Sequence, residues 1–178
     1  MGDESDDVLR VLMVRYQAGE ADAFDALYAA LGPSLRRYLL ALARDAQRAD
    51  DLLQDTFLQL HRSRRTYNPG RPVRPWAFAV ARHVWLMDRR TRRRKAPPHL
   101  NLDAAPDLPV PPEAEGLARG DALRRALAQL PPDRVEALLL HHVWGFKFDE
   151  IGKMLGIRAG AARVRASRAM AALRGLLQ

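Results

Sequence analysis

The sequence predicts an all-α protein made of two small helical domains joined by a proline-rich linker. Apolar residues recur every three or four positions in one segment after another, which is the spacing of a helical face. No segment alternates apolar and polar residues with the period of two typical of a half-buried strand, so we expect almost no sheet. The stretch 96–116 holds six prolines and no helical pattern. It therefore divides the chain into one domain at 1–95 and another at 117–178.

Three helices are expected to build the core of the first domain. Their apolar faces lie within 8–17, 22–31 and 35–42. A Gly-Glu pair at 19–20 separates the first two, and Gly32-Pro33 is expected to end the second, because glycine and proline are poor helix formers. These helices suggest no chemistry of their own.

The next predicted helix, 47–65, has a surface that suggests a partner. Its apolar residues can face a core, which leaves an acidic-amide surface on the outer side, formed by Asp50, Asp51, Gln54, Asp55 and Gln59. An acidic face usually serves only solubility. On an otherwise basic domain, the alternative is a docking surface for a basic partner.

A stiff loop follows at 66–75, because three prolines and a glycine prevent regular structure there. The helix predicted next, 76–95, mixes aromatic residues with arginines. Trp76 fits a core position. Aromatic rings among arginines also suit single-stranded nucleic acid, because bases stack on the rings while guanidinium groups follow the phosphates.

The bulk properties limit the possible partners and compartments. There are 29 Lys and Arg residues against 21 Asp and Glu, and the pI is near 10.7, which favours a polyanionic partner. The absence of cysteine excludes disulfides and thiol catalysis and is compatible with a reducing cytoplasm. No apolar run approaches the roughly 20 residues of a membrane span. We therefore expect a soluble cytoplasmic protein without membrane insertion.

In the second domain, apolar faces near 121–129 and 135–143 predict two further helices. Pro131-Pro132 separates them, and Asp133 is suited to the N-cap of the second.

The segment 147–174 then reads as two helices joined at a glycine. Gly152 lies mid-helix, where a missing Cβ lets another segment approach closely, and Gly156 is expected to end the first helix in the left-handed conformation. The second helix has a narrow alanine stripe on one side, and we expect Arg163, Arg165 and Arg168 to project from the opposite face. These are the parts of a helix-turn-helix, whose second helix lies in the DNA major groove. An ordinary helical hairpin with a solvated basic face is the alternative.

No enzyme site is apparent. His141 and His142 are adjacent, so they point to different faces and cannot chelate a metal as an i, i+4 pair would. Asp50 and Asp51 have no nearby nucleophile or glycine-rich loop. We expect no catalytic residue, metal or cofactor.

Three segments resemble, in order and spacing, those of extracytoplasmic-function sigma factors of bacterial RNA polymerase. They are ADDLLQDTFLQLHR at 49–62, RPWAFAVARHVWLMDRRTRRR at 74–94 and LPPDRVEALLLHHVWGFKFDEIGKMLGI at 130–157. The resemblance covers nearly the whole chain outside the linker. It implies that the first domain is sigma region 2, which binds core polymerase and opens the promoter −10 element. The second would be region 4, which reads the −35 element.

The resemblance also assigns site residues and partners. It places Asp51, Gln54 and Asp55 on the β′ clamp helices of core polymerase, and it makes the β flap and an anti-sigma factor further expected partners. The residues that it places at the −10 element are Tyr67, Asn68, Arg71, Arg74, Trp76, Arg82, His83, Trp85, Arg89 and Arg90. Those that it places at the −35 element are Arg158, Arg163, Arg165, Ser167 and Arg168.

Some positions depart from the family pattern. Lys147 and Arg158 replace the usual serines before the two helices of the helix-turn-helix, and each change removes a side-chain N-cap worth about 1 kcal/mol. Ala161-Ala162 replaces Thr-Val, and His83 replaces an asparagine, so the role of His83 stays open. A one-component regulator, with a helix-turn-helix behind a sensor domain, is the alternative function.

Overall fold

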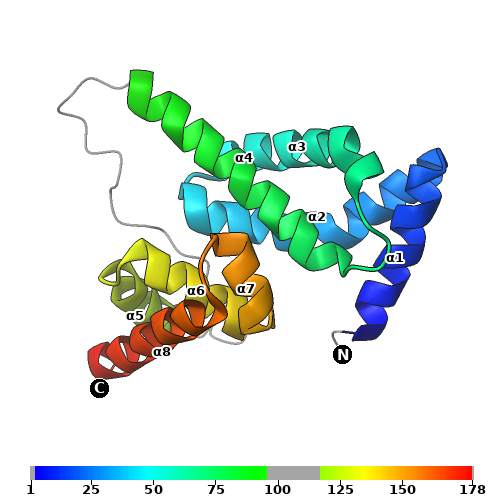
Figure 1. Cartoon of the computed structure of the whole chain (residues 1–178). Coiled ribbons are helices and arrows are strands. Elements are labelled where there is room, and N and C mark those ends of the chain that lie inside the picture. Colours follow the sequence, from blue (N-terminus) through cyan, green and yellow to red (C-terminus); the bar gives the residue numbers. More distant parts are fainter. Residues whose placement is uncertain (1–2, 96–116, 178) are drawn as a thin grey trace. The chain divides into compact units, whose positions relative to one another are not determined.

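The structure is a computed structural model that describes residues 3–95 and 117–177. Contacts divide the chain into two units, Met1–Leu102 and Asp103–Gln178, and the boundary falls inside the predicted linker. The linker itself, 96–116, lies outside the described residues, so its extended character stays a prediction. The described ranges contain helices and turns and no strand, which confirms the all-α class (Figure 1).

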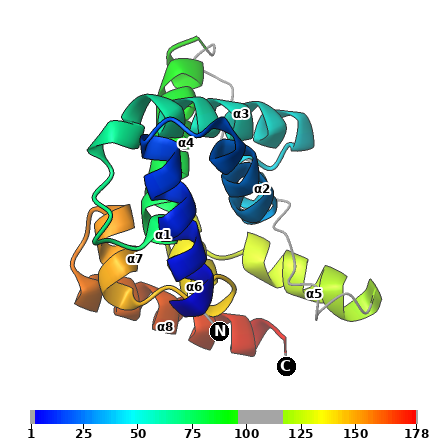
Figure 2. The same ribbon diagram turned by 90° about the vertical axis from the view of Figure 1, so that its right-hand side faces the viewer.

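The described residues of the first unit, 3–95, form four α-helices and one short 3-10 helix. They are α1 (Asp3–Gln17), α2 (Ala21–Ala43), α3 (Ala46–Ser63), η1 (Arg64–Thr66) and α4 (Val73–Lys95). All four α-helices contribute buried apolar residues to the core, and Tyr38 of α2 packs against Phe78 of α4 with ring centroids 5.1 Å apart. The C-terminal end of α4 extends past the neighbouring helices of its unit (Figures 1 and 2).

The prediction that Gly32-Pro33 ends a helix was wrong. The helix α2 runs on through Pro33 to Ala43. Its buried stripe keeps one register across the proline, from Leu31 to Leu35, so packing of this face outweighs the local cost. Pro33 and Ala29 are both exposed, and water can therefore hydrate the Ala29 carbonyl that lacks its usual N–H partner.

The connection between α2 and α3 is short and locally determined. Arg44 ends α2 in the left-handed region with φ 62°, and its N–H donates to the Leu40 carbonyl at 2.9 Å. Asp45 then caps α3, because its side chain accepts from the N–H of Arg48 at 2.9 Å.

The second unit contains α5 (Leu117–Ala128), α6 (Pro132–His142), α7 (Phe148–Leu155) and α8 (Ala159–Leu176). Asp133 was predicted as the N-cap of α6, but the N-cap is Pro131 and the helix begins at Pro132, so Asp133 lies in the first turn. Proline suits the first helical position because its fixed φ matches the helix and its missing N–H would be unpaired there anyway.

The helix-turn-helix predicted at 147–174 is present as α7 and α8. Gly156 ends α7 with φ 68°. A Cβ on Gly152 would lie 2.8 Å from the Ile157 carbonyl oxygen and 3.1 Å from the Ala159 nitrogen, so this glycine admits the backbone of the turn. The predicted inner stripe of α8 is buried and consists of Ala162, Ala166, Ala169 and Leu173. Small side chains let α8 pack closely on α6.

Among the residues that the structure describes, no helix is long and apolar enough to cross a membrane.

Candidate protein-docking and nucleic-acid interfaces

The outer side of α3 carries the predicted acidic stripe. Asp51, Gln54 and Asp55 are all exposed on it. Helical spacing adds Leu58 to the same stripe, and its side chain is 47% exposed. Sequence reasoning missed Leu58, although its position three residues after Asp55 places it on this face. The four side chains form a stripe with two carboxylates, an amide and one apolar group.

The carboxylates of this region divide into two kinds. Asp50 accepts from Arg36 of α2 at 2.6 and 3.1 Å, and this hydrogen-bonded pair lowers the pKa of Asp50 below its ordinary value of 3.8. Asp88 of α4 accepts from Arg48 at 2.8 Å. Within the described part of the chain, Asp51 and Asp55 have no ion-pair partner. The paired acids join helices, whereas the stripe on α3 is open to a partner.

The loop between η1 and α4 is an ordered turn. The N–H of Arg71 donates to the Asn68 carbonyl at 2.9 Å, with Pro69 and Gly70 between them. The Asn68 side-chain oxygen also accepts from the Gly70 N–H at 2.9 Å. Asparagine first and proline second suit a type I turn. The amide nitrogen of Asn68 is left at the exposed tip, where it can donate to a base edge.

Tyr67 lies inside the loop and offers no ring face for base stacking. It is 4% exposed, its ring packs on Trp76 with centroids 5.0 Å apart, and its hydroxyl donates to the Arg71 carbonyl. Burial raises the pKa of this hydroxyl, and the charge of Asp6 adds to the effect. The expected stacking of a base on Tyr67 is therefore not supported in this conformation. The residue stabilises the turn that presents Asn68.

Two residues of α1 hold this loop, and sequence reasoning missed both. Asp6 accepts from the N–H groups of Val73 and Arg74, each at 3.1 Å. Gln17 donates to the carbonyls of Arg64 and Tyr67 at 2.6 and 3.0 Å. The loop passes alongside α1 in both ribbon views (Figures 1 and 2). No sequence signal could have found a cap supplied from 67 positions away.

The helix α4 carries the rest of the predicted −10 set. On it His83 and Arg90 are exposed, as is Arg71 in the loop before it. Half-buried members of the set are Arg74, Trp76, Arg82, Trp85 and Arg89. The guanidinium of Arg89 lies over the Trp85 ring, 5.5 Å from its centroid. The loop and α4 thus bring all ten predicted residues into one continuous segment, with the arginine-rich end most exposed.

The outward side of α8 differs from the one predicted. Val164, Ser167 and Arg168 are exposed opposite the alanine stripe. Arg163 lies on one flank, over the Phe148 ring at 5.5 Å. Arg165 lies on the other flank, with its Nε 3.5 Å from Oδ2 of Asp133 in α6. The expectation that all three arginines project opposite the alanines is therefore wrong for Arg163 and Arg165.

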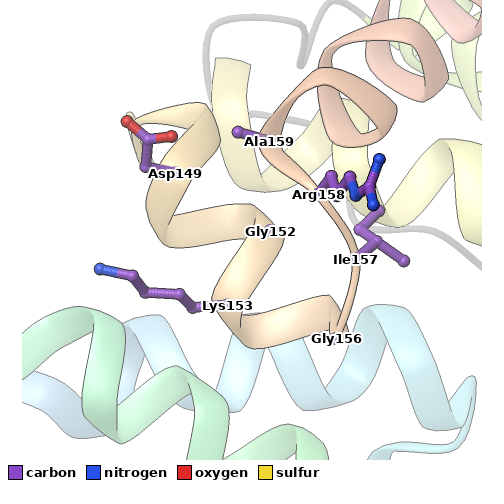
Figure 3. Close-up of a pocket in the computed structure, with 7 residues that line it drawn as sticks. All are labelled: Asp149, Gly152, Lys153, Gly156, Ile157, Arg158 and Ala159. Carbon is purple, nitrogen blue, oxygen red and sulfur yellow. The ribbon is translucent and has the colours of Figure 1, made fainter.

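The turn before α8 forms an open recess with a basic rim. Its lining residues are Asp149, Gly152, Lys153, Gly156, Ile157, Arg158 and Ala159. Figure 3 shows Lys153 extending from α7 on one side and Arg158 from the turn on the other. Arg158 gives α8 no side-chain cap, so first-turn N–H groups are left for an outside acceptor. A helix N-terminus beside cationic side chains favours an anion such as phosphate.

The helix α7 keeps half of a capping box despite the loss of the usual serine. The carboxylate of Glu150 accepts from the Lys147 N–H at 2.8 Å. The Lys147 side chain has no lone pair to offer and makes no cap hydrogen bond.

Comparison with known proteins assigns both units. Residues 27–95 match the family model Sigma-70 region 2, and residues 120–173 match Sigma-70, region 4. RNA polymerase sigma factor CarQ of Myxococcus xanthus is 38% identical over 167 residues, which cover 93% of this chain and 95% of CarQ. ECF RNA polymerase sigma factor EcfG of Rhodopseudomonas palustris is 33% identical over 82% of this chain and 80% of its own.

The fold agrees with these matches. A crystal structure of the sigma factor RpoE with the anti-sigma factor NepR from Bartonella quintana aligns with TM-score 0.73 and 24% identity, over 86% of this chain and 96% of that one. The first unit is thus a sigma region and not a sensor, which excludes the alternative of a one-component regulator. The chain belongs to the sigma-70 family, among the extracytoplasmic-function alternative sigma factors that direct RNA polymerase to promoters.

Proposed function

We propose that the first unit binds core RNA polymerase through the exposed stripe of α3, and that the contact is with the β′ clamp helices. The observation that carries this proposal is the difference between the acids of this region. Asp50 and Asp88 are ion-paired within the unit, whereas Asp51 and Asp55 lie exposed beside Gln54 and Leu58. Carboxylates that have no ion-pair partner among the described residues, placed around one exposed leucine, suit a basic surface with an apolar centre.

The −10 element is recognised by the loop 67–76 and by α4. Asn68 presents its amide nitrogen at the tip of a rigid turn, which lowers the entropy lost when a base is captured. The exposed His83 and Arg90 lie further along α4, and the arginines that follow supply affinity for phosphates that does not depend on sequence.

The −35 element is recognised by α8. Arg168 and Ser167 can hydrogen-bond to base edges in the major groove. Val164, 47% exposed beside them, suits an apolar contact with a thymine methyl group. Arg158 and the uncapped start of α8 receive a phosphate. The β flap of the polymerase is the partner of this unit outside the DNA.

Regulation and location follow the family pattern in this proposal. The relative from Bartonella quintana was solved with an anti-sigma factor, and we expect such a partner to compete with polymerase for this chain. The protein acts in the cytoplasm, without catalytic activity, metal or cofactor of its own.

The docking proposal is tested by charge reversal. The double variant Asp51→Arg, Asp55→Arg places like charges against the clamp, which typically costs several kcal/mol. We expect its affinity for purified core polymerase to fall strongly while its helicity is unchanged. The control Asp25→Arg makes the same kind of change at an exposed position of α2 and should bind normally. Normal binding by the double variant would mean that the stripe does not contact polymerase and serves only solubility.

The promoter assignment is tested by run-off transcription with purified core polymerase on a promoter library. We expect transcripts to be enriched in a common pair of elements with the spacing of −10 and −35. Initiation without such enrichment would contradict the assignment of α4 and α8.

A further inference from the structure

We infer that α1 is a positioning element for promoter opening, because it fixes both ends of the loop that presents Asn68. The inference rests on the proposed role of this loop at the −10 element and extends it to residues outside the family match. The region 2 match begins at residue 27, whereas α1 spans Asp3–Gln17.

Asp6 closes the start of α4. The first N–H groups of a helix have no partner within it. In α4 those of Val73 and Arg74 both donate to the Asp6 carboxylate, and Pro75 has no N–H to satisfy. Val73 is 0% exposed and Asp6 is 7% exposed, so this cap is shielded from water. The residue at the usual capping position is Pro72, whose side chain cannot accept a hydrogen bond.

Gln17 closes the other end of the loop. Its amide donates to the carbonyls of Arg64 and Tyr67, where α3 and η1 end. Asp6 and Gln17 are 11 positions apart in α1, which is about 16 Å along a helix axis. One rigid helix therefore sets the distance between the two ends of the loop.

Several further contacts of the loop lie within the segment itself. Tyr67 packs on Trp76 and donates to the Arg71 carbonyl, and Asn68 closes the turn. These contacts define the shape of the turn, whereas α1 defines where the turn is held relative to the rest of the unit. Loss of either α1 contact leaves the turn intact and misplaces it, which lowers the efficiency of base capture.

The test measures promoter opening separately from polymerase binding. The probe is a duplex promoter selected in the run-off library, with 2-aminopurine in its −10 element, incubated with reconstituted holoenzyme. We expect Asp6→Ala and Gln17→Ala each to lower the opening rate by about tenfold, as for a buried hydrogen-bonding group left without its partner. Affinity for core polymerase should stay within about twofold, since the α3 stripe is unchanged. Asp6→Asn retains one acceptor and should recover part of the rate.

The matched control is Asp7→Ala, which removes the neighbouring carboxylate. Asp7 is exposed and pairs only with Arg10 on the same helix in the described residues. Its opening rate should equal that of the unmodified protein.

A second variant separates positioning from capping. Pro72→Asp supplies a local cap for the Arg74 N–H. Added to Asp6→Ala, it should restore thermal stability without restoring the opening rate, because the start of α4 is still detached from α1. Full recovery of opening would show that Asp6 only caps α4, and would overturn the inference.

The remaining outcomes are also decisive. Equal opening by Asp6→Ala and the unmodified protein overturns the inference and leaves the proposed function intact. A parallel loss of core binding and opening in both alanine variants means that α1 only stabilises the fold, which again overturns it. Failure of the unmodified protein to open any promoter contradicts the proposed function itself.

Discussion

Arg165 of α8 lies beside the carboxylate of Asp133 in α6, with Nε and Oδ2 3.5 Å apart. The pair directs one arginine of α8 toward its own domain. Arg168, one turn further along, has no such neighbour in the described residues and is exposed. The two arginines should therefore contribute differently to promoter recognition.

We predict that Arg168→Ala lowers initiation from −35-dependent promoters more than Arg165→Ala does. A base contact by arginine discriminates by about 1–3 kcal/mol, whereas a partly exposed ion pair contributes about 0–1 kcal/mol to stability. Initiation rates on promoters with single −35 substitutions measure both effects. A larger loss for Arg165→Ala would mean that Arg165 leaves Asp133 when DNA binds.

Gly152→Ala should destabilise the second unit. The added Cβ would lie 2.8 Å from a backbone oxygen of the turn, and overpacking of this kind typically costs about 1–3 kcal/mol. Gly175→Ala is the control, because nothing lies within 4 Å of its added Cβ, and replacing a helical glycine there should gain about 0.4–1 kcal/mol. Denaturant unfolding of the full chain measures both. Equal stability of the two variants would contradict the close approach at Gly152.

Asn68 and Arg90 should differ in how they affect −10 recognition. We expect Asn68→Ala to lower discrimination at one base of the −10 element by about 1–3 kcal/mol, because the tip amide is lost. Arg90→Ala should weaken all sequences alike and flatten the salt dependence, as a phosphate contact does. The measurement is open-complex formation on each single-base −10 variant at two salt concentrations. If Asn68→Ala lowers open-complex formation equally on all −10 variants, residues of α4 and not Asn68 recognise the −10 sequence.

The ion pair between Arg36 and Asp50 predicts a pH effect. Hydrogen bonds from Arg36 lower the pKa of Asp50 below 3.8 in the folded protein. The stabilisation is therefore fully present above pH 3.8 and is lost as the pH falls through the lowered pKa. Arg36→Ala should raise the pKa of Asp50 toward its ordinary value, as followed by NMR titration of the carboxyl carbon. Arg37→Ala removes an exposed neighbouring arginine and should leave the titration unchanged.

Much of this architecture could be predicted because its determinants are local. Helical spacing located most of the helices, Gly156 marked the turn, and the alanines marked the buried side of α8. The helix break expected at Gly32-Pro33 was wrong, because burial of the leucines on both sides outweighs the local cost of proline within a helix. Propensity describes one residue at a time, whereas α2, which carries Leu31 and Leu35, packs against α1, α3 and α4.

The site was less predictable because its geometry depends on contacts distant in sequence. Tyr67 looks like a base-stacking residue until the structure places its ring against Trp76. Arg165 looks like Arg168 until Asp133 is found beside it. The roles of Asp6 and Gln17 have no sequence signature, because both side chains bind backbone atoms. The side chains of the residues whose backbone they bind therefore carry no trace of the contact.

The way in which α1 holds the loop affects how promoter preference can diverge among proteins built this way. Asp6 and Gln17 hold the loop entirely through main-chain N–H and carbonyl groups. Side chains at the tip can therefore be exchanged by mutation while the hydrogen bonds from α1 to the loop backbone are kept. A change of target sequence then requires few substitutions and passes through folded, polymerase-binding intermediates. Such a scaffold makes new promoter preferences accessible by single mutational steps.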